Sequence, residues 1–160
     1  MLGVSSRSSA AAEAVPQIEC RPAGSELEVS AHFRLRRAVF VHEQRLFSFD
    51  DRDECDDLPE TVHGIGLIDG RPLGAVRLYP LDGRRWKGDR LAVDTGYRTH
   101  HLGAELVRFA VATAGSLGGS EMIAHVQLPN VRFFHHLGWR SVGEPAKFHG
   151  VDHQLMSIAL

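Results

Sequence analysis

The chain has 160 residues, of which 43% are hydrophobic, and its 18 basic and 20 acidic side chains give a formal net charge of -2. This length suits one globular domain, and the near-zero charge provides no overall field that would attract nucleic acid or an anionic membrane, so we expect neither partner. No stretch reaches membrane-spanning length, and Cys20 and Cys55 lack the spacing of metal ligands, which favours free thiols in a cytoplasmic protein.

The first elements follow a segment rich in Ser and Ala. We interpret residues 1–16 as a flexible tail that precedes a single domain over residues 17–160. Residues 18–22 predict a short strand, because Pro and Gly follow it directly. Residues 25–44 contain apolar side chains three or four apart without Pro or Gly, which predicts a helix capped by Ser25, with a break near His32 as an alternative.

An acidic stretch comes next, over residues 47–59, with five aspartates and one glutamate. It lacks the Gly and the terminal Glu of a calcium-binding EF-hand loop. Two interpretations remain open: the carboxylates attract a cationic substrate, or they are simply solvated.

The middle and the end of the chain predict most of the sheet. Residues 61–68 and 72–79 have strand character, and the Asp-Gly pair between them predicts an antiparallel hairpin. Another strand ends at 91–93, and a helical crossover leads to a parallel strand at 122–127. A short helix at 131–137 and strands at 139–142 and 154–159 complete the order β-α-β-β-β-α-β-α-β-β, an uneven α/β (α+β) arrangement.

The junction between residues 94 and 104 is a candidate phosphate site. A turn at residues 94–96 ends a strand, and helical spacing begins near His101. The first N–H groups of a helix are unpaired and its dipole is positive there, so anions bind such ends. Gly103 and Ala104 add little bulk, while Arg98 and His101 add positive charge.

Ten histidines raise the question of a metal site. The two adjacent pairs, at 100–101 and 135–136, cannot chelate one ion from a helix, because neighbouring residues face different directions. We therefore predict no metal.

Three motifs together resemble the GCN5-related N-acetyltransferase (GNAT) superfamily. They are the strand at 91–93 (LAV), the junction at 98–104 (RTHHLGA) and residues 130–139 (NVRFFHHLGW). His101 stands where the family usually has Gly. The resemblance implies a mixed, mostly antiparallel sheet of six to seven strands flanked by about four helices. It also implies an acetyl-CoA cosubstrate and transfer of its acetyl group to a small-molecule amine that attacks the thioester directly.

A finer resemblance is to the ElaA-like branch and its relatives associated with nitrogen starvation. It is carried by residues 35–44 (LRRAVFVHEQ), by His63 and by residues 150–153 (GVDH). This branch implies association with nitrogen-metabolism enzymes.

The resemblance also assigns residues. The implied coenzyme A contacts are Leu91, Ala92, Val93, Arg98, Thr99, His101, Leu102, Gly103, Ala104, Asn130 and Phe133. The implied base is one of Glu43, His63 and His153, because an alkylammonium with a pKa of about 10.4 must lose a proton before it attacks. The implied substrate contacts are Arg36, Phe40, Asp50 and Asp53.

One departure keeps alternatives open. Phe134 stands where many GNAT enzymes have the Tyr that protonates the leaving thiolate, so the chain could instead be a non-catalytic coenzyme A-binding or interaction module. Acyl-homoserine lactone synthases also resemble the chain at Arg36, Val39 and Phe40. Val41, Phe47 and Phe49 could form an apolar patch of a homodimer or line the substrate pocket.

Overall fold

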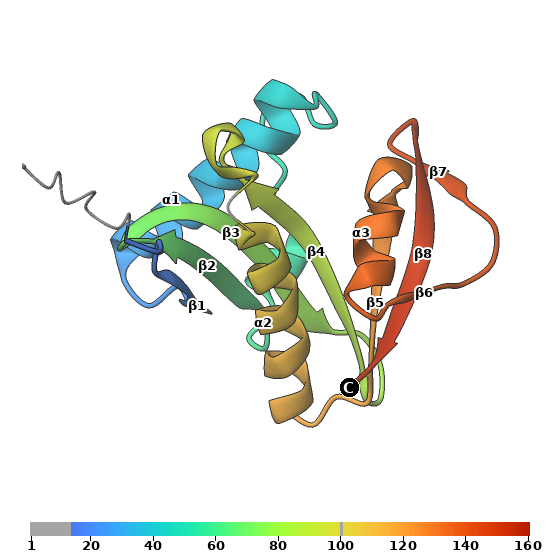
Figure 1. The fold of residues 1–160 in the computed structure, drawn as a ribbon. Helices are drawn as coiled ribbons and strands as arrows, with labels where there is room; N and C mark the ends of the chain where they lie inside the picture. The colour runs from blue at the N-terminus through green and yellow to red at the C-terminus, as the bar shows by residue number, and fades with distance from the viewer. Residues whose placement is uncertain (1–13, 100) are drawn as a thin grey trace, which may run out of the picture.

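The computed structural model describes residues 14–99 and 101–160, which form one mixed sheet with helices on both faces (Figure 1). The strands are β1 (Ile18–Pro22), β2 (Val62–Ile68), β3 (Arg71–Pro80), β4 (Arg85–Val93), β5 (Glu121–Gln127), β6 (Arg140–Ser141), β7 (Ala146–Phe148) and β8 (Val151–Ala159). The α-helices are α1 (Glu26–Arg37), α2 (Leu102–Ser116) and α3 (Val131–His136). Most of the predicted tail, residues 1–13, lies outside this description.

The sheet confirms the predicted fold class. Its order is β1-β2-β3-β4-β5-β8-β6, with β7 paired to β8, and only β4 and β5 run parallel. Within the described residues there are eight strands rather than six to seven and three α-helices rather than about four. The additional strand, β7, lies in the segment that the sequence predicts to be a polar loop. No helix in the described part of the chain has the length and apolar character needed to cross a membrane.

The predicted hairpin between β2 and β3 is confirmed. Asp69 and Gly70 have φ values of 50° and 80°, the left-handed conformation that a two-residue turn between twisted strands requires. Cys20 and Cys55 are free thiols, as expected.

Helix α1 differs from its prediction at its end rather than its middle. Ser25 caps it by accepting the N–H of Glu28 at 3.1 Å. The helix is not broken at His32, because that side chain is fully buried and its Nδ1–H donates to the Gly64 carbonyl at 2.8 Å. After α1 the chain continues as a π-helix over Ala38–Glu43, a widened turn that often accompanies a functional site.

Helix α2 packs closely on the sheet because glycines lie beneath it. Leu102 and Leu106 are fully buried, and a Cβ atom added at Gly74 would lie 2.6 Å from Leu106 Cδ1 and 2.9 Å from Leu102 Cδ2. Helix α1 covers the opposite face, where Leu35 packs with Ile65. The first turn of α2 is therefore held firmly against β2 and β3.

Strands β4 and β5 separate partway along their length. They pair only at Arg85 with Glu121, Trp86 with Met122 and Lys87 with Ile123. Beyond these three pairs the strands diverge, with α2 beside β4 and α3 beside β5 (Figure 1). The β5-facing edge of β4, over residues 88–93, therefore has no partner strand.

Candidate active site

A pocket occupies the gap between the diverging strands. Leu91 of β4 and Gln127 of β5 line it together with Asn130 at the start of α3. Phe40 and Phe47 enter from the segment after α1, and the β7–β8 hairpin contributes a third wall. Segments far apart in the sequence thus meet at one cavity.

A β-bulge shapes the β4 side of this pocket. Ala75 pairs with Ala92 and Arg77 with Asp89, so Arg90 and Leu91 together lie opposite Val76. Arg90 has a φ of 53°, a left-handed conformation that is uncommon for a residue other than glycine. The bulge redirects the main chain at the point where β4 faces the gap.

The predicted phosphate site lies beside the end of β4. Helix α2 begins at Leu102, one residue after His101, whose φ of 62° turns the chain into the helix. A Cβ atom added at Gly103 would lie 3.9 Å from both Phe133 Cζ and Val93 Cγ2, which is ordinary contact. The structure therefore brings together Val93, Gly103 and Phe133, three of the predicted coenzyme A contacts.

Two of the predicted contacts can be made only through the main chain. The side chains of Leu102 and Ala92 are buried in the core, at 0% and 1% exposure. Only their main-chain atoms can contribute to a ligand site.

Glu43 is not a free base. Its carboxylate accepts two hydrogen bonds from the Arg98 guanidinium, Nη1 to Oε1 and Nη2 to Oε2, both at 2.6 Å. The hydrogen bonds from Arg98 are the main cause that lowers the pKa of Glu43, and they raise the pKa of Arg98 in turn. Arg98 is one of the residues of the predicted phosphate site, so Glu43 lies next to that predicted site.

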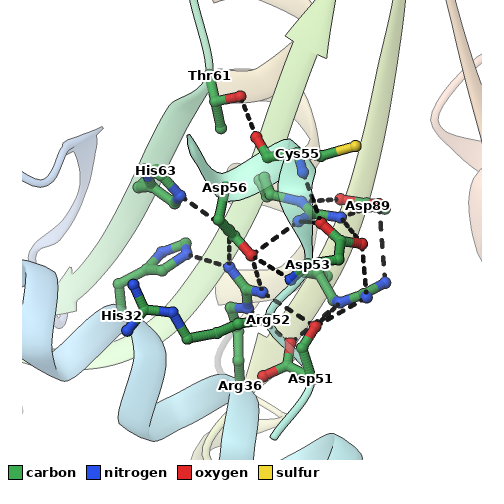
Figure 2. A network of polar contacts seen from close by, with 12 residues as sticks. His32, Arg36, Asp51, Arg52, Asp53, Cys55, Asp56, Thr61, His63 and Asp89 are labelled. Carbon is green, nitrogen blue, oxygen red and sulfur yellow. Dashed lines mark hydrogen bonds and ion pairs between the residues drawn. The ribbon is translucent and has the colours of Figure 1, made fainter. Parts of the chain in front are cut away.

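Three carboxylates of the acidic stretch, those of Asp51, Asp53 and Asp56, are paired, and Arg36 is at the centre of that pairing (Figure 2). The other three, on Asp50, Glu54 and Asp57, are exposed. Arg36 is fully buried and donates to Asp51 and Asp56, both at 2.7 Å. Arg77 donates to Asp53 at 2.6 Å. The prediction that Arg36 contacts the substrate is therefore wrong, because its charge is used inside the protein.

Of the other predicted substrate contacts, one lines the pocket and two do not. Phe40 lines the pocket. Asp50 is exposed, accepts the N–H of Arg52 at 3.2 Å and does not line the pocket. Asp53 is held by Arg77 and by Arg90.

His63 also belongs to the ion-pair network and not to the pocket wall. Its Nε2 lies 2.9 Å from Asp56 Oδ1 (Figure 2). Burial alone would raise the pKa of Asp56, but the hydrogen bonds from His63 and Arg36 outweigh it and leave that pKa well below its usual range. His63 is thus a partner of a structural carboxylate.

His153 is the candidate base that lines the pocket. Its Nδ1 lies 2.8 Å from the Val151 carbonyl oxygen, which only accepts, so Nδ1 carries the hydrogen. Nε2 of the neutral ring then holds a lone pair. The side chain is 7% exposed and packs edge-on against Phe148, with ring centroids 5.6 Å apart.

Several pocket residues were missed by the sequence reasoning. Lys87, Asp89 and Arg90 come from a part of β4 that was not predicted to be a strand. His125 and His149 also line the pocket. The alternation of side chains along a nine-residue β4 would have placed Lys87 and Asp89 on one face, had the length of the strand been recognised.

The apolar side of the pocket contains Phe134, which is 8% exposed and has no proton to donate. Of the three residues considered for a dimer patch, Val41 is buried and Phe47 lines the pocket, which leaves Phe49 exposed. Among the described residues, no three His, Cys, Asp or Glu side chains are grouped as metal ligands.

Known proteins resemble this chain in sequence and in fold. A model of the acetyltransferase (GNAT) family matches residues 28–139. The Bacillus subtilis (strain 168) protein "Putative acetyltransferase BSU40680" is 30% identical over 134 residues, which cover 83% of this chain and 90% of that protein. The crystal structure of a "putative N-acetyltransferase from Lactobacillus plantarum" has a TM-score of 0.78 at 25% identity and covers 89% of this chain and 98% of its own.

The fold does not select one branch among its neighbours. Escherichia coli ElaA has a TM-score of 0.76 at 21% identity, covering 89% of this chain and 98% of its own. A CoA-dependent acyl-homoserine lactone synthase, BjaI, solved with SAM and isopentyl-CoA, has a TM-score of 0.73 at 21% identity, covering 90% and 83%. At these identities both show a common fold and no more.

Proposed function

Because the chain belongs to the acetyltransferase (GNAT) family, we propose that it transfers an acetyl group from acetyl-CoA to the amine of a small molecule. One observation carries this proposal: the unpaired edge of β4 lines a pocket, and the last residue of that edge, Val93, lies next to the N-terminus of α2, where the Gly103 Cβ position is 3.9 Å from Val93 Cγ2. An extended acyl-CoA needs a strand edge for its amide-containing arm and an anion site for its pyrophosphate.

The donor would lie along this edge. The main chain of residues 88–93 would hydrogen-bond the pantetheine arm, and the first N–H groups of α2 would bind the pyrophosphate. Gly103 allows close approach, since outside its own stretch of helix the nearest atoms to its Cβ position, Phe133 Cζ and Val93 Cγ2, lie 3.9 Å away. The thioester would then sit between Leu91 and Asn130, both of which line the pocket.

The chemistry is a direct attack. The nitrogen lone pair of the amine attacks the thioester carbonyl carbon, the carbon–sulfur bond breaks, and the electron pair leaves with the coenzyme A thiolate. Nε2 of His153 takes the proton that the amine loses. A main-chain N–H at the bulge in β4 stabilises the oxyanion, and the thiolate takes its proton from water because Phe134 has none to give.

Calorimetric titration with acetyl-CoA tests the donor site. The wild type should bind, whereas Gly103→Glu should not, because a carboxylate then faces the pyrophosphate. The helix dipole stabilises a Glu in the first turn, so loss of binding would not reflect unfolding. Gly115→Glu is the matched control, because a Cβ there meets only Leu160 Cβ at 3.8 Å near the other end of α2.

A screen of amines for release of free coenzyme A thiol would complete the test. Absence of binding by the folded wild type, or equal binding by the wild type and Gly103→Glu, would contradict the proposed site.

A further inference from the structure

The charged side chains on one wall of the pocket differ in whether they have partners within the protein. Asp89 lines the pocket, but its carboxylate accepts two hydrogen bonds from the buried Arg77, at 2.8 Å and 2.7 Å. Arg90 lines it too, and its guanidinium donates to Asp51 Oδ2 at 3.0 Å. These charges are satisfied within the protein, so they leave little attraction for a ligand of either sign.

Lys87 is different. It lines the same pocket, and no residue in the described part of the chain forms an ion pair or a side-chain hydrogen bond with its ammonium group. It is the last residue of β4 that pairs with β5, so it stands at the closed end of the gap. The pocket therefore has an unpaired positive charge at its base.

The charge of Lys87 acts on the ring of His125. His125, on β5, stacks on Phe148 with ring centroids 6.0 Å apart and an interplanar angle of 5°. Burial is the main cause that lowers the pKa of His125. The positive charge of Lys87 lowers this pKa further, and His153 has the same effect to a smaller extent. No carboxylate among the pocket-lining residues is free to neutralise Lys87, because Asp89 is held by Arg77.

Lys87 and His153 lie at different depths of the pocket. Lys87 pairs with Ile123, and His153 pairs with Gln127, four residues further along β5. At about 3.3 Å per residue these two rows are about 13 Å apart along the strand. A lysine side chain can span part of that distance, which leaves room for an acceptor several bonds long between Lys87 Nζ and His153 Nε2.

From these observations we propose that the acceptor is an amine that also carries an anionic group, separated from the amine by several bonds, and that Lys87 binds the anionic group while the amine reaches the thioester beside His153. This rests on the proposed acetyltransferase function. It differs from the interpretation that the acidic stretch attracts a cationic substrate, because Asp51 and Asp53 of that stretch pair with Arg36, Arg77 and Arg90.

A matched series of acceptors tests the proposal. Amino acids with a terminal amine, from glycine to 6-aminohexanoate, are compared with n-alkylamines and with diamines of equal length, using acetyl-CoA and release of free thiol. Aminoalkyl phosphates form a further arm, which distinguishes a carboxylate from a phosphate as the anionic group. The longer anionic amines should have kcat/KM values about ten- to hundredfold above those of the n-alkylamines, which lack an anionic group.

Substitution of Lys87 supplies the decisive comparison. Lys87→Met should remove this preference by lowering kcat/KM for the anionic amines alone, and Lys87→Arg should retain most of it. Lys147→Met is the control, because Lys147 is the other lysine of the chain, is exposed and pairs with Asp152 outside the pocket. Diamines as the preferred substrates, or an equal loss on all amines in Lys87→Met, would overturn the proposal.

A binding measurement separates this proposal from the proposed function. The protein loaded with coenzyme A is titrated with 6-aminohexanoate, which should bind to the wild type and at least tenfold more weakly to Lys87→Met. Binding of acetyl-CoA without any binding or acetylation of anionic amines would overturn the role of Lys87 and leave the donor site intact. Failure to bind acetyl-CoA would instead contradict the proposed function.

Discussion

At the scale of single residues, His153 is distinguished by the fixed direction of its ring. Its Nδ1–H is committed to the Val151 carbonyl, so Nε2 is the atom available to a substrate. We expect His153→Ala to lower kcat by about 10²- to 10⁴-fold with an unchanged Kd for acetyl-CoA, as removal of a general base does. Added imidazole should restore part of the rate.

The exposed His136 provides the control for that experiment. His136→Ala should retain full activity with and without imidazole. The opposite result would contradict this assignment. If His63→Ala lost this much activity at unchanged stability while His153→Ala remained active, His63 and not His153 would be the base.

Glu43 and Arg98 allow a second prediction at this scale. In the proposed donor site, the pyrophosphate of acetyl-CoA would compete with the Glu43 carboxylate for the Arg98 guanidinium. Glu43→Gln should therefore lower the Kd for acetyl-CoA severalfold, and Arg98→Met should raise it about tenfold, both measured by calorimetry. A large loss of kcat in Glu43→Gln with an unchanged Kd would indicate instead that Glu43 acts as the base.

At this same scale, the sequence predicted residue types better than residue roles. His153, Gly103 and Asn130 were chosen as candidate site residues because they occur in short motifs. Arg36 occurs in an equally clear motif, yet it is buried against carboxylates 15 and 20 residues away. No local pattern indicates whether a charged side chain will meet a substrate or a distant part of its own chain.

At the scale of elements, the close packing of α2 over Gly74 connects the stability of the protein with binding of the donor. Gly74→Ala would force Leu102 and Leu106 to move, which should cost about 1–3 kcal/mol in the free energy of unfolding. Because Leu102 is the first residue of α2, the variant should also bind acetyl-CoA more weakly. Chemical denaturation and calorimetry measure the two effects.

Gly115→Ala serves as the control, because it should raise the free energy of unfolding instead of lowering it. A Cβ there meets only Leu160 Cβ at 3.8 Å, and replacing Gly by Ala inside a helix stabilises it by about 0.5–1 kcal/mol. Equal stability of Gly74→Ala and the wild type would mean that α2 can move away from the sheet at no cost.

Elements with strong local signals were the ones predicted well. The Asp69-Gly70 turn and the periodicity of α2 fixed the hairpin and the crossover helix. Strand β7 was missed because Ala146, Lys147 and Phe148 are all exposed and show no alternation. The divergence of β4 from β5 was also not predictable, because it depends on pairing between segments more than 30 residues apart.

At the scale of the whole molecule, the ion-pair network and His32 connect α1 to the sheet. Burial is the main cause that lowers the pKa of His32 from 6.5 to about 3, and the positive charge of Arg36 adds to it. The folded protein therefore resists protonating His32, whereas the unfolded chain takes up that proton below about pH 6.5. The stabilisation is complete above that pH and is lost as the pH falls from 6.5 toward 3.

We expect this single group to reduce the free energy of unfolding by about 2 kcal/mol between pH 7 and pH 5, at 1.36 kcal/mol per unit of pKa. Urea denaturation of His32→Asn, which keeps a donor for the Gly64 carbonyl, should show a correspondingly shallower dependence on pH. His136→Asn should retain the wild-type slope. Parallel curves for the wild type and His32→Asn would show that His32 titrates normally in the folded state.

The short pairing between β4 and β5, over three residue pairs, also has a consequence for the protein in the cell. A fold that leaves a strand edge open for its donor is completed only when the donor is bound, so its stability follows mass action. At a free acyl-CoA concentration one hundred times its Kd, the gain is about 2.7 kcal/mol. Where acyl-CoA is scarce, a larger fraction of the chains would be unfolded and exposed to proteases, so the supply of donor would set the lifetime of the enzyme as well as its rate.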